Sequence, residues 1–361
     1  MKYLNALNNI SGVGPGKFKT LLNFFSSGEA IWKSDFKEIT QSGIDEKLAQ
    51  KIITERKNIN PDQEWEKLEK ENVKIILITD PAYPQLLKEI SNAPHLLYVK
   101  SNDSELDFNS RPMISVVGSR KFTQYGEQVA NSLSRELSQA GIIVVSGMAL
   151  GIDAIAHKST LNSEGKTIAI LGSGLSDSNI GPKTNFNLSR RIIENGALIS
   201  DYPLAIQSTP QTFPARNRIM AGMTLGTIVI EAQKKSGTLI TANLALDFNR
   251  EVFAIPGSIF SPSSEGSNNL IKSGAKLVTS INDILEEINL EKELIKQETK
   301  RIIPASLEEE IIIKILNYEP MHIDRITKLT KLGTSVVSSN LTILEIRGVI
   351  KNVGGQNYIL T

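Results

Sequence analysis

Six short apolar runs, separated by segments of helical periodicity, constrain the fold of this sequence more than any other feature. They occupy residues 114–117, 142–145, 167–171, 197–200, 227–230 and 252–255. Apolar runs of this length, rich in β-branched residues, are typical of strands buried on both faces. Because they alternate with helices, the sequence predicts an α/β fold built on a doubly wound parallel sheet.

The segments that flank these strands share one chemical character. In an open parallel sheet, ligands collect beyond the carboxyl ends of the strands. Glycines, hydroxyls or cations stand there in Gly118-Ser119-Arg120, Ser146-Gly147, Gly172-Ser173-Gly174 with Lys183 in the following loop, Arg216-Asn217-Arg218 and Ser236-Gly237-Thr238. Glycine lets a backbone approach an anion closely, and a helix that starts after the first turn presents unpaired N–H groups. The sequence therefore predicts a groove that binds phosphate groups along one edge of the sheet.

Three polar residues within this region could be catalytic, but we interpret them as structural. Asp153 and His157 stand four residues apart on one helical face, and we expect them to bond to each other or to the backbone. Glu231, at the end of the fifth strand, is expected to organise a loop. No third ligand stands at metal spacing, so the sequence predicts no metal site.

Composition limits the remaining classes of function. Forty basic and 39 acidic residues leave a net charge of +1, so a nucleic acid would have to be recognised by a local patch. The absence of cysteine excludes disulfides, thiolate zinc sites and a cysteine nucleophile. No stretch of about 18 apolar residues is present, and the sequence predicts a cytoplasmic protein without a membrane partner.

The two ends of the chain differ from the middle. Residues 1–65 are expected to be helical, and the glycine-containing segments 10–18 and 39–49 resemble the turns of helix-hairpin-helix modules, with DNA contact or simple packing both open. Residues 289–305 are predicted to be a charged linker. Residues 306–361 predict three helices and a hairpin, a winged helix. Its recognition helix, residues 335–347, carries Ser338, Ser339, Asn340, Thr342 and Glu345 without a basic cluster, which favours partner docking or weak DNA binding.

Taken in order, the central motifs resemble the DNA-processing protein A family (DprA, also called Smf). The resemblance covers about residues 73–285. The motifs that carry it are Asp80-Pro81-Ala82-Tyr83-Pro84, Val117-Gly118-Ser119-Arg120, Ser146-Gly147-Met148-Ala149-Leu150-Gly151-Ile152-Asp153-Ala154-Ile155-Ala156-His157, Phe213-Pro214-Ala215-Arg216-Asn217-Arg218-Ile219-Met220-Ala221-Gly222, Ser236-Gly237-Thr238-Leu239-Ile240-Thr241-Ala242, Ile255-Pro256-Gly257 and Glu265-Gly266-Ser267-Asn268-Asn269-Leu270-Ile271.

The resemblance implies a Rossmann-like core at residues 66–288, without catalysis or cofactor. Such a core would form a homodimer, bind and protect incoming single-stranded DNA, and load the RecA recombinase during natural transformation. The implied DNA-binding residues are Gly118, Ser119, Arg120, Ser146, Gly147, Lys183, Arg216, Asn217, Arg218, Ser236, Gly237 and Thr238. One departure is visible, because Gly181-Pro182 precedes Lys183 where the family usually has Tyr-Pro. Phe186 or Phe213 could stack on a base.

Two alternatives of other classes remain. One is a nucleotide-binding or phosphoribohydrolase-like Rossmann enzyme, although the glutamate of that group's glycine-rich loop is missing from Lys235-Ser236-Gly237-Thr238-Leu239-Ile240-Thr241. A dinucleotide-dependent oxidoreductase is not one of the two, because no acidic residue that could bind a ribose hydroxyl follows the second strand at Val145. The other alternative is an interaction scaffold whose pocket binds nothing.

Overall fold

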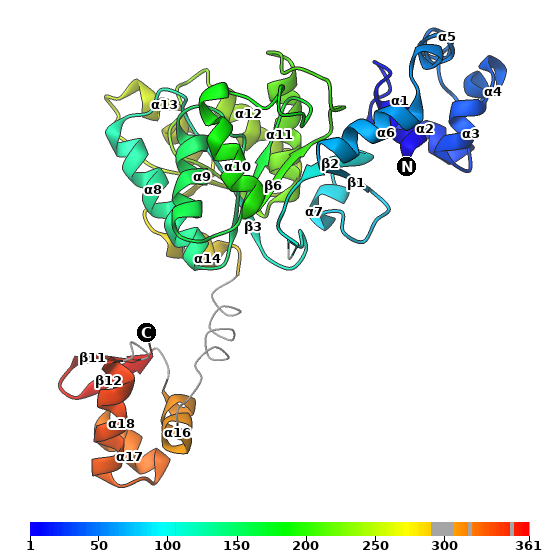
Figure 1. Cartoon of the computed structure of the whole chain (residues 1–361). Coiled ribbons are helices and arrows are strands. Elements are labelled where there is room, and N and C mark those ends of the chain that lie inside the picture. Colours follow the sequence, from blue (N-terminus) through cyan, green and yellow to red (C-terminus); the bar gives the residue numbers. More distant parts are fainter. Residues whose placement is uncertain (105, 290–305, 317–319, 347–349, 361) are drawn as a thin grey trace. The chain divides into compact units, whose positions relative to one another are not determined.

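The computed structural model describes residues 1–104, 106–289, 306–316, 320–346 and 350–360, and Figure 1 shows the whole chain. The chain divides into two compact units, Met1–Ile288 and Asn289–Thr361. The predicted boundary between residues 65 and 66 falls inside the first unit and stays a prediction. The predicted linker lies outside the described residues except for Asn289.

A nine-stranded sheet forms the centre of the first unit. Its strands are β1 (Val73–Leu77), β2 (Leu96–Lys100), β3 (Met113–Val117), β4 (Ile143–Ser146), β5 (Thr167–Ile170), β6 (Gly196–Ser200), β7 (Gly226–Val229), β8 (Glu251–Ala254) and β9 (Lys276–Leu277). Their order is β1-β2-β6-β5-β4-β3-β7-β8-β9. β2 pairs antiparallel with both β1 and β6, and all other neighbouring strands pair in parallel. The predicted doubly wound, Rossmann-like α/β core is confirmed, and its six predicted strands are β3 to β8. β9 is not predicted by the sequence pattern, because both of its residues are exposed and do not belong to an apolar run.

Helices cover both faces of this sheet. They are α7 (Gln85–Lys88), α8 (Gln124–Gln139), α9 (Ile152–Asn162), α10 (Phe186–Glu194), α11 (Thr212–Met223), α12 (Gly237–Asp247), α13 (Glu265–Lys272) and α14 (Ile281–Glu287). Alternate strand residues face opposite sides. On β5, Ala169 joins the core beneath α9 and α10, whereas Ile168 and Ile170 join the core beneath α7, α11 and α12. In Figure 1, α8, α9 and α10 lie side by side.

The strand order reverses at β3, which fixes where a ligand can bind. From β3 the chain proceeds through β4, β5 and β6 in one direction, and then β7 pairs with the other side of β3. The carboxyl ends of β3 and β7 therefore flank the topological switch point, where the crossover connections leave a crevice.

Helices precede the sheet, as expected for residues 1–65. They are α1 (Lys2–Asn8), α2 (Pro15–Phe24), α3 (Gly28–Lys33), α4 (Phe36–Gln41), α5 (Glu46–Glu55), the 3-10 helix η1 (Arg56–Asn58) and α6 (Pro61–Lys70). Gly12 and Gly43, in the two predicted hairpin turns, have positive φ angles of 101° and 94° that favour glycine. The Tyr98 hydroxyl of β2 donates to Asn5 of α1 at 2.8 Å, which ties these helices to the sheet. DNA contact by the hairpins stays a prediction.

The second unit is a winged helix, as predicted. It contains α16 (Leu307–Ile315), β10 (Met321–His322), α17 (Ile323–Thr330), α18 (Thr334–Ile346), β11 (Ile350–Gly354) and β12 (Asn357–Leu360). The sheet order is β10-β12-β11, and the short β10 was not predicted. The three helices enclose a core around Ile326, Val337 and Leu344. The outer face of α18 exposes Val336 and Ile343. Arg347, the predicted end of this helix, lies outside the described residues.

Candidate nucleic-acid interface

The turn after β3 is closed by its own side chains. Ser119 Oγ accepts a hydrogen bond from the Lys121 N–H at 3.1 Å and donates to the Lys121 carbonyl at 2.7 Å. Thr123 then caps α8 by accepting from the Gly126 N–H at 3.2 Å. This turn holds Arg120 exposed to solvent, without an ion-pair partner in the described part of the chain.

The start of α8 is already occupied by a protein carboxylate. Buried Glu231 accepts from the Thr123 N–H at 2.9 Å and from its hydroxyl at 2.6 Å. A Cβ on Gly126 would lie 2.5 Å from Glu231 Cδ, so only glycine fits there. The interpretation of Glu231 as a loop organiser is confirmed. The Thr123 and Gly126 N–H groups are therefore already bonded within the protein. The expectation that the start of this helix presents N–H groups to a phosphate stays a prediction for Gln124 and Tyr125.

The turn after β4 packs directly against the turn after β3. Gly151 has a φ of 86°, and a Cβ on it would lie 2.4 Å from the Ser119 carbonyl oxygen. The Ile152 N–H donates to that same carbonyl at 3.2 Å. The two turns therefore form one rigid surface, in which Gly118 allows Ile152 to pack closely.

Beneath these turns lies a buried polar cluster. Asp153 accepts from the N–H groups of Gly147 and Ala149 at 3.2 and 3.4 Å. Arg216, only 4% exposed, donates to the Gly147 carbonyl at 2.8 Å and also to the Ile170 carbonyl. Burial lowers the pKa of Arg216 to about 10, so its guanidinium stays charged at neutral pH. Burial also raises the pKa of Asp153, an effect that the nearby Arg216 opposes.

His157 completes this buried layer. Its Nδ1 lies 2.7 Å from the Thr167 hydroxyl, and desolvation lowers the pKa of the imidazole to about 3. Asp153 bonds to the backbone, as expected. His157 bonds to a threonine hydroxyl, so the expectation that it bonds to Asp153 or to the backbone is wrong. The two residues do not form an acid–base pair with each other.

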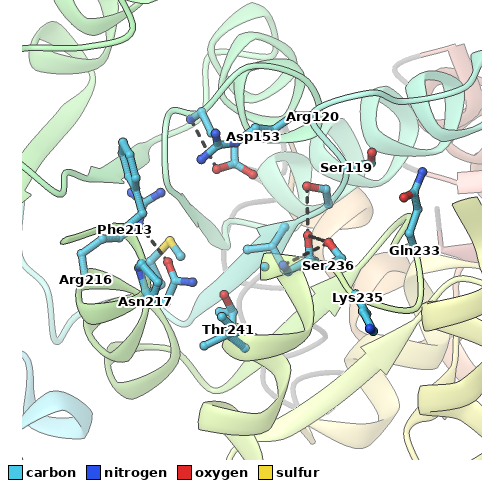
Figure 2. Close-up of a pocket in the computed structure, with 18 of the residues that line it drawn as sticks. Ser119, Arg120, Asp153, Phe213, Arg216, Asn217, Gln233, Lys235, Ser236 and Thr241 are labelled. Carbon is cyan, nitrogen blue, oxygen red and sulfur yellow. Dashed lines mark hydrogen bonds between the residues drawn. The ribbon is translucent and has the colours of Figure 1, made fainter. Parts of the chain in front are cut away.

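Above the buried layer, a cavity of about 700 Å³ opens at the switch point between β3 and β7. Figure 2 shows the side chains that surround it. It is lined by Val117, Gly118, Ser119, Arg120, Lys121, Ala149, Asp153, Pro210, Phe213, Pro214, Arg216, Asn217, Met220, Gln233, Lys235, Ser236, Gly237, Thr238, Ile240 and Thr241. The rim is cationic, because Arg120, Lys121 and Lys235 are exposed.

An aromatic ring stands beside the rim cations. The guanidinium carbon of Arg120 lies 5.3 Å from the centre of the Phe213 ring, within the range of a cation–π contact. Across the cavity, the Thr238 hydroxyl donates to the Gly118 carbonyl at 3.1 Å, while Ser236 Oγ accepts from the Thr238 N–H at 3.2 Å. These bonds fix the α12 start next to the first turn. A cation, a ring face and hydroxyls thus converge on one opening.

The structure brings together eight of the twelve sequence-predicted site residues. The residues that line the cavity are Gly118, Ser119, Arg120, Arg216, Asn217, Ser236, Gly237 and Thr238. Ser146 and Gly147 lie beneath them and are buried, and Ser146 Oγ donates to the Val116 carbonyl at 2.6 Å. A Cβ on Gly147 would lie 2.1 Å from Arg216 Nη2, so this glycine makes room for the arginine.

Two predicted cations lie away from the cavity lining. Exposed Lys183, in the 3-10 helix η2 (Lys183–Asn185), donates to the Ser178 carbonyl at 2.7 Å. Arg218 forms an ion pair with Asp201 and is mostly buried. Lys121 and Lys235 are not among the twelve predicted site residues, although each stands directly beside one of them. Of the two aromatic candidates, Phe213 lines the cavity and Phe186 does not.

Among the described residues, no group of three or more His, Cys, Asp or Glu side chains could hold a metal ion. No helix in the described ranges is both long and apolar enough to span a membrane.

Comparison with known proteins decides the family. The family model of DNA recombination-mediator protein A matches residues 74–289, and the model of the DprA winged helix domain matches residues 296–356. Protein Smf of Synechocystis is 34% identical over 390 residues, which cover 99% of this chain and 98% of that protein. The chain belongs to the DprA/Smf family.

Solved DprA structures agree in fold. The X-ray structure of DprA from Streptococcus pneumoniae is similar with a TM-score of 0.68 and 35% identity, covering 80% of this chain and 98% of that one. DprA from Helicobacter pylori, whose structure was described for its unique single-stranded DNA binding mode, is similar with a TM-score of 0.54 and 27% identity. That match covers 60% of this chain and 95% of the other. The resemblance seen in the sequence motifs is thereby confirmed for this DprA/Smf member.

Proposed function

We propose that this protein binds single-stranded DNA in the cavity at the β3–β7 switch point. The observation that carries the proposal is the exposed cation Arg120 beside the half-buried ring of Phe213, on a rim that also holds Lys121 and Lys235. Cations that follow a backbone and an aromatic face that stacks on any base are the two elements of sequence-tolerant single-strand binding. The single-stranded DNA binding of the H. pylori relative supports the proposal that this protein also binds single-stranded DNA.

The chemistry of the cavity favours binding over catalysis. The acidic residue of the lining, Asp153, is buried and already accepts two backbone N–H groups. Thr241 stands where a phosphoribohydrolase-like enzyme would carry its glutamate, and a threonine hydroxyl does not serve as a general base at neutral pH without a partner. We therefore propose a binding protein that is not an enzyme and needs no cofactor.

We further propose that the protein protects incoming single strands and loads RecA onto them in the cytoplasm during natural transformation, acting as a homodimer. Family membership supports this proposal. Light scattering of the purified protein tests the dimer, and a doubled mass is the expected result. RecA ATPase activity on single strands coated with single-strand-binding protein tests loading, and the expected result is faster activation when this protein is added.

A matched pair of variants tests DNA binding. Arg120→Ala removes an exposed guanidinium over the Phe213 ring, and Arg190→Ala removes one that lies 5.0 Å from the Phe186 ring, outside the cavity lining. Fluorescence anisotropy of a labelled single strand is followed across a salt series. For single strands each phosphate contact contributes about −0.7 to the slope of log K against log salt concentration.

The expected result is a wild-type slope that becomes shallower by about 0.7 in Arg120→Ala and stays unchanged in Arg190→Ala. Equal behaviour of the two variants would place the DNA elsewhere on the chain. Absence of binding by the wild type would favour the scaffold alternative.

A further inference from the structure

The most exposed large apolar side chains of the described residues stand together on one turn beyond β8. Ile259 and Phe260 are 84% and 90% exposed. Because both side chains are so exposed, neither packs in the core of the first unit. Adjacent apolar side chains presented to solvent in this way mark a contact with another molecule.

The turn that carries them is held in place by its neighbours. Asn268 of α13 accepts from the Gly257 N–H at 3.2 Å and donates to the Gly257 carbonyl at 3.0 Å. The Ser261 N–H donates to the Ser258 carbonyl at 3.0 Å, which closes the turn around the two apolar residues. The Phe260 ring is therefore presented by an ordered turn and not by a frayed end.

This turn is continuous with the wall of the DNA-binding cavity. β8 pairs in parallel with β7, so their carboxyl ends lie at the same edge of the sheet. The Gly266 N–H of α13 donates to the Ala232 carbonyl at 2.7 Å, and a Cβ on Gly266 would lie 2.6 Å from that oxygen. The loop that α13 contacts here continues directly into Gln233 and Lys235, which line the cavity.

Two lysines stand on the loop that joins the cavity lining to the contact with α13. Lys235 is exposed on the cavity rim, and Lys234 is exposed with its ammonium 3.5 Å from a Glu265 carboxylate oxygen at the start of α13. Exposed ion pairs of this kind contribute little and are easily exchanged for a phosphate partner. The edge thus offers an aromatic ring at the cavity, two lysines, and a second aromatic ring.

We propose that Phe260 is a second base-stacking platform, onto which a single strand extends after it leaves the cavity, with Ile259 packing beside the same base. The inference rests on the proposed function and adds a residue that the cavity does not include. Single-stranded DNA is the occupant we favour, because the loop that runs from the cavity lining to α13 is cationic and because every base has a face that can stack on an aromatic ring.

The experiment compares Phe260→Ala and Phe260→Trp with a matched control. Leu307→Ala removes another strongly exposed apolar side chain, in the second unit. Each protein is titrated with oligothymidylates of about four and about 20 nucleotides, a range that spans the site sizes of single-strand binding proteins. Replacing a stacking aromatic by alanine weakens binding by roughly 5- to 150-fold.

We expect Phe260→Ala to lose affinity for the long oligonucleotide by that factor and to bind the short one like the wild type. Phe260→Trp is expected to bind both normally, with indole fluorescence quenched only by the long one. Leu307→Ala is expected to behave as the wild type throughout.

Wild-type affinity of Phe260→Ala for the long oligonucleotide would overturn the inference while leaving the proposed function intact. The same holds if Phe260→Ala changes only the mass measured by light scattering, since the turn would then be a contact between copies of the chain. A wild-type protein that binds neither oligonucleotide would overturn both proposals.

Discussion

Arg216 is predicted to support the DNA-binding surface without touching phosphate, and Arg216→Met tests this role. The substitution keeps the length of an apolar stem but removes the hydrogen bonds to the Gly147 and Ile170 carbonyls. A hydrogen bond from a charged group contributes about 1.5–3 kcal/mol, so two give about 3–6 kcal/mol. Loss of the coulombic attraction between Arg216 and Asp153 acts in the same direction, whereas removal of a buried charge that desolvation disfavours acts against it. We expect the free energy of unfolding to fall by about 3–5 kcal/mol.

Urea denaturation measures this loss, with Arg120→Ala as the control in the same region. Because Arg120 is exposed, its removal is expected to change the free energy of unfolding by less than about 0.5 kcal/mol. In the salt series, Arg216→Met is expected to weaken DNA binding without changing the slope. Wild-type stability of Arg216→Met together with a shallower slope would refute the reasoning, because it would make Arg216 a phosphate contact.

Two more predictions concern the same buried layer. Since the folded pKa of His157 is about 3 and the unfolded one about 6.5, protons bind preferentially to the unfolded chain between these values, and stability falls as pH falls through this window. Relative to His157→Gln, wild-type stability measured by urea denaturation should therefore drop by about 1.4 kcal/mol per pH unit between about pH 6 and 4, and parallel curves would contradict this. Gly147→Ala should destabilise the fold by about 1–3 kcal/mol, because the added Cβ overpacks against Arg216. Gly237→Ala is the control and should not destabilise the fold, because the space around Gly237 is open. Thermal denaturation compares the two variants, and equal melting temperatures would contradict the packing argument.

The periodicity of the sequence predicted the sheet well, because buried parallel strands are continuous apolar runs. β3 to β8 lie within one or two residues of their predicted positions. β9 could not be found in this way, because both of its residues are exposed and only pairing with β8 makes it a strand. The winged helix shows the same limit, since the two-residue β10 exists only through its partner β12.

The site was harder to predict, because one motif contains cations with different roles. In Phe213-Pro214-Ala215-Arg216-Asn217-Arg218, helical spacing puts residues 213, 216 and 217 on one face of α11 and Arg218 on another. That spacing could have separated Arg218, which pairs with Asp201, from the residues that line the cavity. It could not show that Arg216 is buried, since burial depends on Gly147 and Ile170, which lie far away in sequence.

Charge pattern alone also failed to rank the lysines. Lys183 follows a loop that departs from the family pattern, and its ammonium bonds to the Ser178 carbonyl. Lys121 and Lys235 owe their places on the cavity rim to the closed turn at Ser119 and to the reversal of strand order at β3. Which cations lie at the cavity therefore depends on how distant strands and turns pack together, more than on any local motif.

We propose that a single strand lies against the Phe213 ring in the switch-point cavity. Photocrosslinking with an oligonucleotide that carries 5-iodouracil, followed by mass spectrometry of the digested protein, tests it most directly. The predicted result is a crosslink on Phe213 that is lost in Phe213→Leu and weakened in Arg120→Ala. Crosslinks confined to the hairpin turns at Gly12 and Gly43, or to the winged helix, would contradict the claim.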